Sequence, residues 1–168
     1  MAKQKNHEHK VNVQYDENLK HDRSYDTLVS QAIVGALASE AVDMPCVVNV
    51  LITEDDGIRE YNREYRKIDK ATDVLSFPMQ TFLQAGWNGL CEPEFDEDTG
   101  DLLLGDIVIS LESVERQAAE YGNTIKHEMA YLIIHSSLHL LGYNHDDEVS
   151  EKVMHSKNEK IIQEMDLT

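Results

Sequence analysis

The chain has 168 residues, of which 41% are hydrophobic and 28% charged, and these are ordinary proportions for one compact domain. Its formal net charge of −17 argues against a general nucleic-acid binder, because sequence-independent affinity for phosphate comes from clustered Lys and Arg. No apolar stretch reaches the ~20 residues that cross a bilayer, and the first residues lack the apolar core of a signal peptide. We therefore expect a cytoplasmic protein without a membrane partner.

No internal repeat or Pro- or Gly-rich linker divides the sequence, so we expect a single domain over 1–168, with a flexible polar tail over 1–10. Cys46 and Cys91 form no C-x-x-C motif, and we expect both to be free thiols.

In chain order, the apolar periodicity predicts a strand at 11–15, a helix at 25–42, a strand at 46–53, a helix through Ile58, Tyr61 and Tyr65, strands at 72–77 and 102–110, and helices at 111–121, 124–141 and 148–165.

Polar residues mark the expected starts of the first two helices. Asp22 or Ser24 can cap the helix at 25–42, and Asp55 or Asp56 can cap the helix that follows.

Residues 80–101 form a long predicted loop. Six carboxylates, three glycines, the absence of Lys and Arg, and an exposed-looking Trp87 predict a mobile acidic segment. Such a loop can be a lid over a site or a tolerated insertion, and the sequence does not separate these two roles.

Three histidines near the end of the helix at 124–141 have the spacing of metal ligands, H-x3-H-x5-H. His135 and His139 are four residues apart, which places both imidazoles on one helix face about one turn apart. Gly142 can adopt the left-handed conformation that ends a helix, so the returning chain can bring His145 to the same point. Three protein ligands leave an open position on a tetrahedral ion, as in catalytic rather than structural zinc sites.

The alternative is three unrelated histidines that are either hydrogen-bonded in the interior or solvated, which the spacing argues against. We assign no function to four histidines that lack partners at this spacing, namely His7, His9, His127 and His155.

The spacing also resembles the metzincin protease motif H-E-x-x-H-x-x-G-x-x-H, in which the Glu after the first His is the general base. Ser136 occupies that position here, and a serine hydroxyl cannot readily take a proton from water. A zinc-dependent peptidase is therefore the second hypothesis.

Three separate segments match, in order, the motifs of one enzyme family. Residues 135–145 are similar to H-G-x-L-H-L-x-G-Y-D-H, with Ser136 and Asn144 in place of Gly and Asp. Residues 62–78 follow N-x-x-Y-R-x-x-D-x-P-T-D-V-L-S-F-P, with Ala71 in place of Pro, and 104–110 supply the third match, L-G-D-I-V-I-S. From about Val47 to the C-terminal helix, the chain resembles the YbeY family of metal-dependent endoribonucleases.

The resemblance implies an α+β fold, a small mixed β-sheet with surrounding helices, and a metal site at the end of a central helix. It implies one divalent metal ion, taken to be zinc, and single-stranded RNA as the substrate. The implied role is 16S rRNA 3′-end maturation and ribosome quality control, with the small ribosomal subunit and other processing factors as partners.

The resemblance also singles out residues of the second motif. Arg66 matches its arginine and becomes a candidate catalytic residue that holds a phosphate or the charge of the transition state. The alternative is a salt bridge to Asp69 or Asp73, within a solvated helix face over 57–72 that has five cations against three anions. Ser76 is a candidate substrate contact or an ordinary strand hydroxyl.

Asp106 and Asp146 can each orient a metal-bound imidazole through a hydrogen bond, or can act as helix caps. The leading hypothesis is attack on phosphorus by a metal-activated water or by the RNA 2′-hydroxyl, two nucleophiles that the sequence does not separate. A third hypothesis is a ribosome-associated factor in which the metal has only a structural role.

Overall fold

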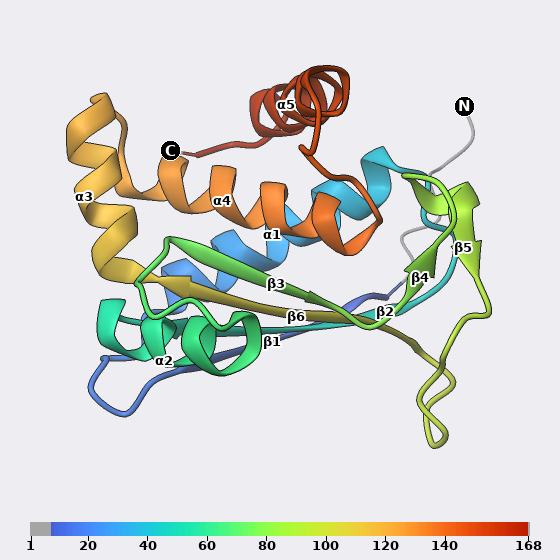
Figure 1. Cartoon of the computed structure of the whole chain (residues 1–168), viewed down its shortest axis with the longest axis horizontal. Coiled ribbons are helices and arrows are strands. Elements are labelled where there is room, and N and C mark those ends of the chain that lie inside the picture. The colour runs from blue at the N-terminus through green and yellow to red at the C-terminus, as the bar shows by residue number, and fades with distance from the viewer. Residues whose placement is uncertain (1–7, 168) are drawn as a thin grey trace.

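A four-stranded mixed sheet is at the centre of the computed structural model, which describes residues 8–167 (Figure 1). The strands of the molecule are β1 (Lys10–Tyr15), β2 (Cys46–Thr53), β3 (Val74–Pro78), β4 (Thr81–Phe82), β5 (Leu90–Cys91) and β6 (Leu102–Ser110). The order in the main sheet is β1-β2-β6-β3, in which the first three strands are parallel and β3 is an antiparallel edge strand. A separate two-stranded ribbon consists of β4 and β5.

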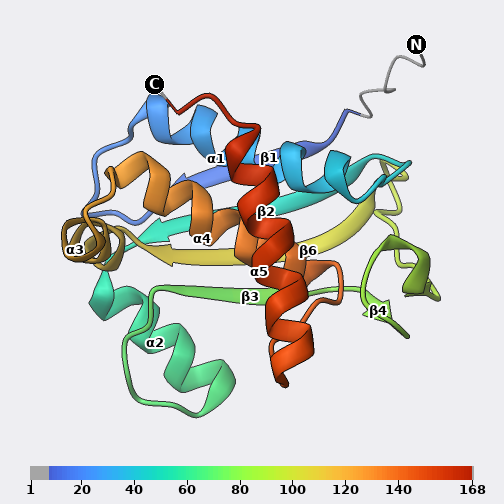
Figure 2. The same ribbon diagram turned by 90° about the horizontal axis from the view of Figure 1, so that it is seen from above.

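Helices cover the two faces of this sheet unequally (Figures 1 and 2). The α-helices of the described chain are α1 (Arg23–Ser39), α2 (Asp55–Arg66), α3 (Leu111–Tyr121), α4 (Ile125–Leu140) and α5 (Glu148–Gln163). On one face α1 and α4 pack side by side, and α5 crosses α4 on the side away from the sheet. The α+β fold with a small mixed sheet, which the resemblance implies, is confirmed.

The main core lies between the sheet and the helices α1 and α4. Because successive side chains of a strand point to opposite faces, β2 directs Val48, Val50 and Ile52 into this core. Ile107 and Ile109 of β6 lie beside them, and all five are almost completely buried. The strands predicted at 46–53 and 102–110 are therefore confirmed.

The central helix α4 is buried around most of its circumference, because it packs against α1, α3, α5 and β3. A helix enclosed in this way is apolar on nearly every side, which explains the run of Leu and Ile in its sequence. The helix predicted at 124–141 is confirmed, with Thr124 as the N-cap and Leu141 as the C-cap.

Gly105 of β6 allows β3 and the end of α4 to approach the same point of the sheet. Its φ is +153°, and a Cβ there would lie 2.5 Å from the carbonyl oxygen of Phe77 and 2.8 Å from Cδ2 of Leu140. Any larger residue would push the edge strand or the helix away. The C-terminal turn of α4 therefore lies next to β3.

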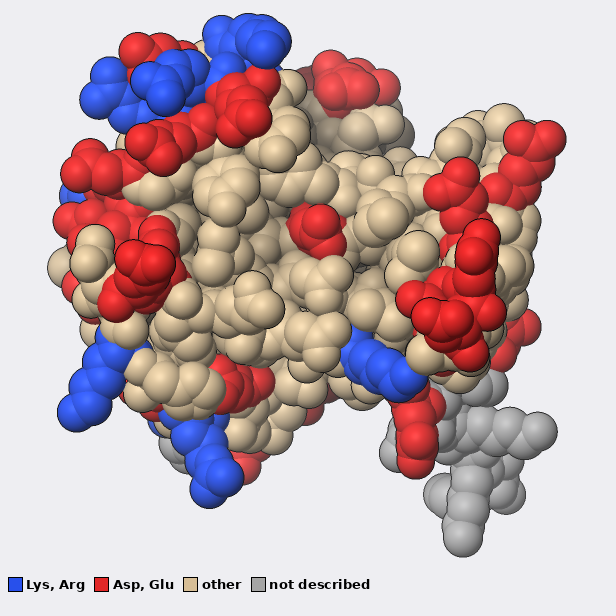
Figure 3. Space-filling view, turned by 90° about the horizontal axis from the view of Figure 1, so that it is seen from below, with Lys and Arg blue, Asp and Glu red and all other residues tan. Residues whose placement is uncertain are grey.

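Of the described helices, α2 alone covers the other face of the sheet. Ile58 of this helix forms a second small core with Leu75 and Val108. Beyond α2 the face is open, and it presents a largely uncharged surface on which most of the charged residues lie toward the periphery (Figure 3).

One of the two predicted helix starts differs from the structure. Asp22 caps α1, as expected, and accepts a hydrogen bond from the Ser24 N–H at 2.9 Å. The prediction that Asp55 or Asp56 caps α2 is wrong, because the N-cap residue is Glu54 and its side chain makes no capping hydrogen bond.

The segment 80–101, predicted to be a loop throughout, contains β4, β5 and a short 3-10 helix, Trp87–Gly89. Trp87 is half-buried, and its Nε1 donates a hydrogen bond to Asp43 at 2.8 Å.

Cys46 and Cys91 are free thiols, as expected. Of the predicted tail, 1–7 lie outside the described residues and Lys10 already belongs to β1. None of the described helices is long and apolar enough to cross a bilayer.

Asp55 joins the starts of α2 and α3 instead of capping its own helix. Its Oδ1 accepts hydrogen bonds from the hydroxyls of Ser110 and Ser113 at 2.6 and 2.7 Å, and its Oδ2 accepts one from Arg116 at 3.1 Å. Partial burial alone would raise the pKa of this carboxyl, but the hydrogen bonds outweigh burial and hold the pKa below its ordinary value.

We expect Asp55→Asn to lower the free energy of unfolding at pH 7 by roughly 1–3 kcal/mol, the range for a charged hydrogen-bonding group. Because the pKa is lowered in the folded state, the stabilisation is complete above the unfolded-state value of about 3.9 and is lost as pH falls through the folded value. Urea unfolding at pH 7 and pH 3 measures this difference. Asp56→Asn, at an exposed position in the same turn, is the control, and an equal loss in both variants would contradict the assignment.

Candidate metal centre

Three imidazole rings converge at the C-terminal end of α4. Nε2 of His135 and Nε2 of His139 are 3.0 Å apart, and one ring nitrogen from each of these residues and from His145 lies within 4.8 Å of the others. Two nitrogens bound to one tetrahedral zinc ion lie about 3.3 Å apart, since each Zn–N bond is about 2.0–2.1 Å long. The three side chains therefore fit a single divalent ion.

The turn after α4 brings the third histidine back toward the helix. Gly142 has a φ of +91°, in the left-handed region that the sequence predicted for it. A Cβ at this position would lie 2.6 Å from Cβ of Phe82, so the position is also too crowded for a side chain. The Gly142 N–H donates to the carbonyl of His139 at 3.0 Å, which closes the turn and directs the chain toward His145.

The orientation of His139 depends on a backbone carbonyl. Nδ1 of its ring lies 2.8 Å from the carbonyl oxygen of Tyr143, and a carbonyl can only accept, so Nδ1 carries the proton. Nε2 is then left with a lone pair directed at the other two imidazoles. The expectation that Asp146 orients an imidazole is not met, because no hydrogen bond joins its carboxylate to a histidine within residues 8–167.

Burial favours the neutral form of these rings. It lowers the pKa of His135 to about 4, and the nearby His139 and His145 act in the same direction. Burial also lowers the pKa of His139, although the hydrogen bond to the Tyr143 carbonyl opposes this effect. Both imidazoles are therefore uncharged at neutral pH, which is the form that binds a metal ion.

The histidines lie at one end of a groove of about 740 Å³ between α4 and β3. Arg66, at the end of α2, and Ser76, on β3, line the same groove, so all five candidate residues come together from three distant parts of the chain. Asp69 forms its salt bridge with Arg59 at 2.8 Å. The guanidinium of Arg66 has no hydrogen bond or ion pair with the described residues 8–167, so the salt bridge considered as its alternative role does not form.

The groove also contains polar residues that the sequence analysis did not select. Glu128 and Tyr131 lie seven and four positions before His135 on α4, and this helical spacing was a signal that could have identified them. Burial raises the pKa of Glu128. Asp73 and Gln117 also line the groove and are joined by a hydrogen bond of 3.3 Å, a pairing without a local sequence signal.

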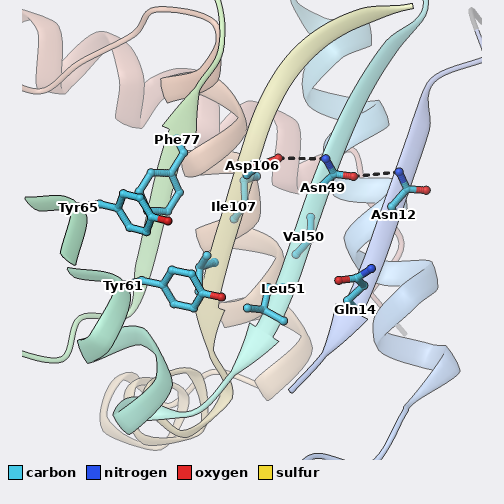
Figure 4. A pocket seen from close by; sticks show the side chains of 11 residues that line it. Asn12, Gln14, Asn49, Val50, Leu51, Tyr61, Tyr65, Phe77, Asp106 and Ile107 are labelled. Carbon is cyan, nitrogen blue, oxygen red and sulfur yellow. Dashed lines mark hydrogen bonds between the residues drawn. The ribbon is translucent and has the colours of Figure 1, made fainter. Parts of the chain in front are cut away.

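A second cavity, of about 380 Å³, lies on the opposite face of the sheet (Figure 4). Asn12, Asn49 and Asp106 form a row across its floor, joined by hydrogen bonds of 2.9 and 3.0 Å, and Tyr61 and Tyr65 stand at its side. The expectation that Asp106 orients a metal ligand is therefore wrong, because its side chain points away from the histidines through the alternation of β6.

Comparison with known proteins agrees with the motifs at this site. The model of the YbeY family, described as endoribonuclease YbeY, matches residues 10–166. The chain belongs to the YbeY family. A member from Clostridium kluyveri is 40% identical over 147 residues, which cover 84% of this chain and 90% of that protein. One from Agathobacter rectalis is 42% identical over 145 residues, which cover 83% and 88%. Both are named endoribonuclease YbeY.

A solved structure supports the same fold. The solution structure of TM1509 from Thermotoga maritima resembles this YbeY-family chain with a TM-score of 0.56 and 26% sequence identity. The likeness covers 91% of this chain and 87% of that one.

We expect the purified protein to carry about one divalent ion per chain and His139→Ala to lose it, because two remaining imidazoles hold an ion weakly. Elemental analysis after gel filtration measures the ion and identifies it. His155→Ala removes an exposed histidine outside the groove and should leave the metal content unchanged. Full metal content in His139→Ala would contradict the site.

Proposed function

We propose that this chain is a metal-dependent endoribonuclease that cleaves single-stranded RNA in the groove beside the three histidines. Membership of the YbeY family supports the RNA substrate, since the relatives carry the name endoribonuclease. The observation that carries the proposal is the guanidinium of Arg66, which has no hydrogen bond or ion pair with residues 8–167 and lines the same groove as the imidazoles. A free guanidinium beside a metal site suits the paired oxygens of a phosphodiester.

In this proposal His135, His139 and His145 hold one divalent ion, for which zinc is the simplest candidate given three imidazoles. When bound, such an ion supplies Lewis-acid chemistry that activates a nucleophile and stabilises charge on a phosphoryl oxygen. Because burial keeps His135 and His139 neutral, these ligands need not lose a proton before binding.

Arg66 then binds the non-bridging oxygens of the scissile phosphate and stabilises the additional negative charge of the transition state. Ser76, which lines the groove from β3, donates a hydrogen bond to the RNA strand in this proposal. The nucleophile is either a water molecule or the RNA 2′-hydroxyl. A 2′,3′-cyclic phosphate at the cleaved end identifies the hydroxyl, and a linear phosphate formed without a cyclic intermediate identifies water.

The peptidase hypothesis requires a general base after the first ligand, and Ser136 is in no position to act as one. Its side chain is completely buried, and its Oγ has no hydrogen-bond partner among the described residues. A proton acceptor in that place would have to face the groove.

The cellular role in the proposal is 16S rRNA 3′-end maturation on the small ribosomal subunit, in the cytoplasm. The scarcity of positive charge in the groove supports the proposal that a partner contributes to binding of the RNA substrate. Among the described residues, the lining of the groove includes Asp73 and Glu128 but only one Lys or Arg side chain, that of Arg66, so phosphate finds few favourable contacts there.

We expect Arg66→Ala to lower kcat for single-stranded RNA by about 10²–10³-fold, the range for losing one preorganised contact to transition-state charge. Metal content should not change, since Arg66 is not a ligand. Arg63→Ala, which removes an exposed arginine of the same helix, should keep at least half of the activity. Equal activity of Arg66→Ala and the wild type would remove Arg66 from the mechanism.

We also expect unstructured RNA to bind the isolated protein with a Kd weaker than about 1 μM at physiological salt, because the chain is strongly acidic. Fluorescence anisotropy with a labelled oligonucleotide measures this affinity. Nanomolar binding without ribosomes would show that no partner is needed.

A further inference from the structure

Tyr143, in the turn that follows α4, is held by two charged residues from distant parts of the chain. Lys157 of α5 donates a hydrogen bond to Oε2 of Glu40, the C-cap residue of α1, at 3.0 Å. The Lys157 ammonium also lies 5.2 Å from the centre of the Tyr143 ring. Burial raises the pKa of the Tyr143 hydroxyl, the nearby Glu40 carboxylate acts in the same direction and the nearby Lys157 opposes it, so the three side chains form one network.

The Glu40 end of this network is buried, and the Lys157 end is partly exposed. The Glu40 side chain is 6% exposed and that of Lys157 is 34% exposed. The backbone of Gly86 packs closely against the Tyr143 hydroxyl, since a Cβ at position 86 would lie 3.0 Å from it. Desolvation makes such a charge pair a weak source of net stability, and one established use of buried ion pairs is to fix a single arrangement.

The other end of Tyr143 contacts the candidate metal centre. Its carbonyl oxygen accepts the hydrogen bond from Nδ1 of His139, and its N–H donates to the carbonyl of Leu138 at 3.1 Å. A displacement of the short turn that carries this carbonyl would pull the Tyr143 ring away from Lys157 and Gly86. The charged pair on one side of the residue is therefore mechanically connected to a metal ligand on the other.

We propose that the Glu40–Lys157 pair is a positioning device for the metal centre. By holding the ring of Tyr143, the pair keeps the Tyr143 carbonyl at Nδ1 of His139 and so keeps Nε2 directed at the ion. The inference rests on the metal site of the proposed function. It adds that α1 and α5, neither of which supplies a ligand, determine how well that site is organised.

The first test is the affinity of the purified protein for Zn²⁺, measured by competition with a chromophoric chelator in the absence of RNA. We expect Lys157→Met and Glu40→Gln each to weaken Zn²⁺ binding about 10-fold or more, as losses of the groups that orient metal ligands do. Lys152→Met, which removes an exposed lysine of the same helix, should stay within about twofold of the wild type.

The second test separates positioning from a general loss of stability. A long-range ¹H–¹⁵N correlation spectrum of the metal-free protein reports the tautomer of each histidine. We expect His139 to be protonated at Nδ1 in the wild type and to populate both tautomers in Lys157→Met, at a temperature where circular dichroism shows both proteins folded. Tyr143→Phe, which leaves no charge unpaired, is the substitute if the charge variants do not fold, and the same shift is expected.

The inference is overturned if the folded variants keep wild-type Zn²⁺ affinity and the wild-type tautomer of His139. A wild-type protein that binds no Zn²⁺ would overturn the metal site itself, and with it the proposed function. Because neither measurement uses RNA, a protein that binds the ion but cleaves no RNA would contradict the proposed function and leave this inference standing.

Discussion

The burial of α4 is the constraint on which the rest of the candidate site depends. The sheet, α1 and α5 enclose this helix, so the two imidazoles on its remaining open side have fixed positions one turn apart. Gly105 then allows the edge strand β3 to lie beside the last turn of α4. The groove is the space between the two elements, and its shape follows from how closely the backbone permits them to approach.

The charge that lines the groove explains how an acidic protein can act on RNA. His135 and His139 are neutral, and the described residues that line the groove include one guanidinium, that of Arg66, and the carboxyl groups of Asp73 and Glu128. Such a lining does not attract phosphate by itself, and a divalent ion on the three imidazoles would supply the missing positive charge. An acidic protein can thus act on RNA at one point without binding RNA over its whole surface, which is consistent with a net charge of −17.

Local patterns predicted the elements well wherever packing agreed with propensity. The strands at 46–53 and 102–110 and the helix at 111–121 have the predicted bounds, because their apolar periodicity and the caps beside them act within a few residues. The predicted cap at Asp55 failed for a tertiary reason, since Ser110 and Ser113 approach its carboxylate from another element. The short ribbon within 80–101 was also missed, because two-residue strands carry no periodic signal.

The candidate site shows the same contrast between what local sequence patterns predict and what tertiary packing decides. The H-x3-H-x5-H spacing and Gly142 were sufficient to predict that three imidazoles meet, because helix geometry and one left-handed residue act over only eleven positions of the chain. Which other groups reach them was decided by the tertiary structure. Arg66 and Ser76 enter the groove, whereas Asp106 lies beneath the sheet, because strand alternation and the packing of distant elements choose the face on which a side chain emerges.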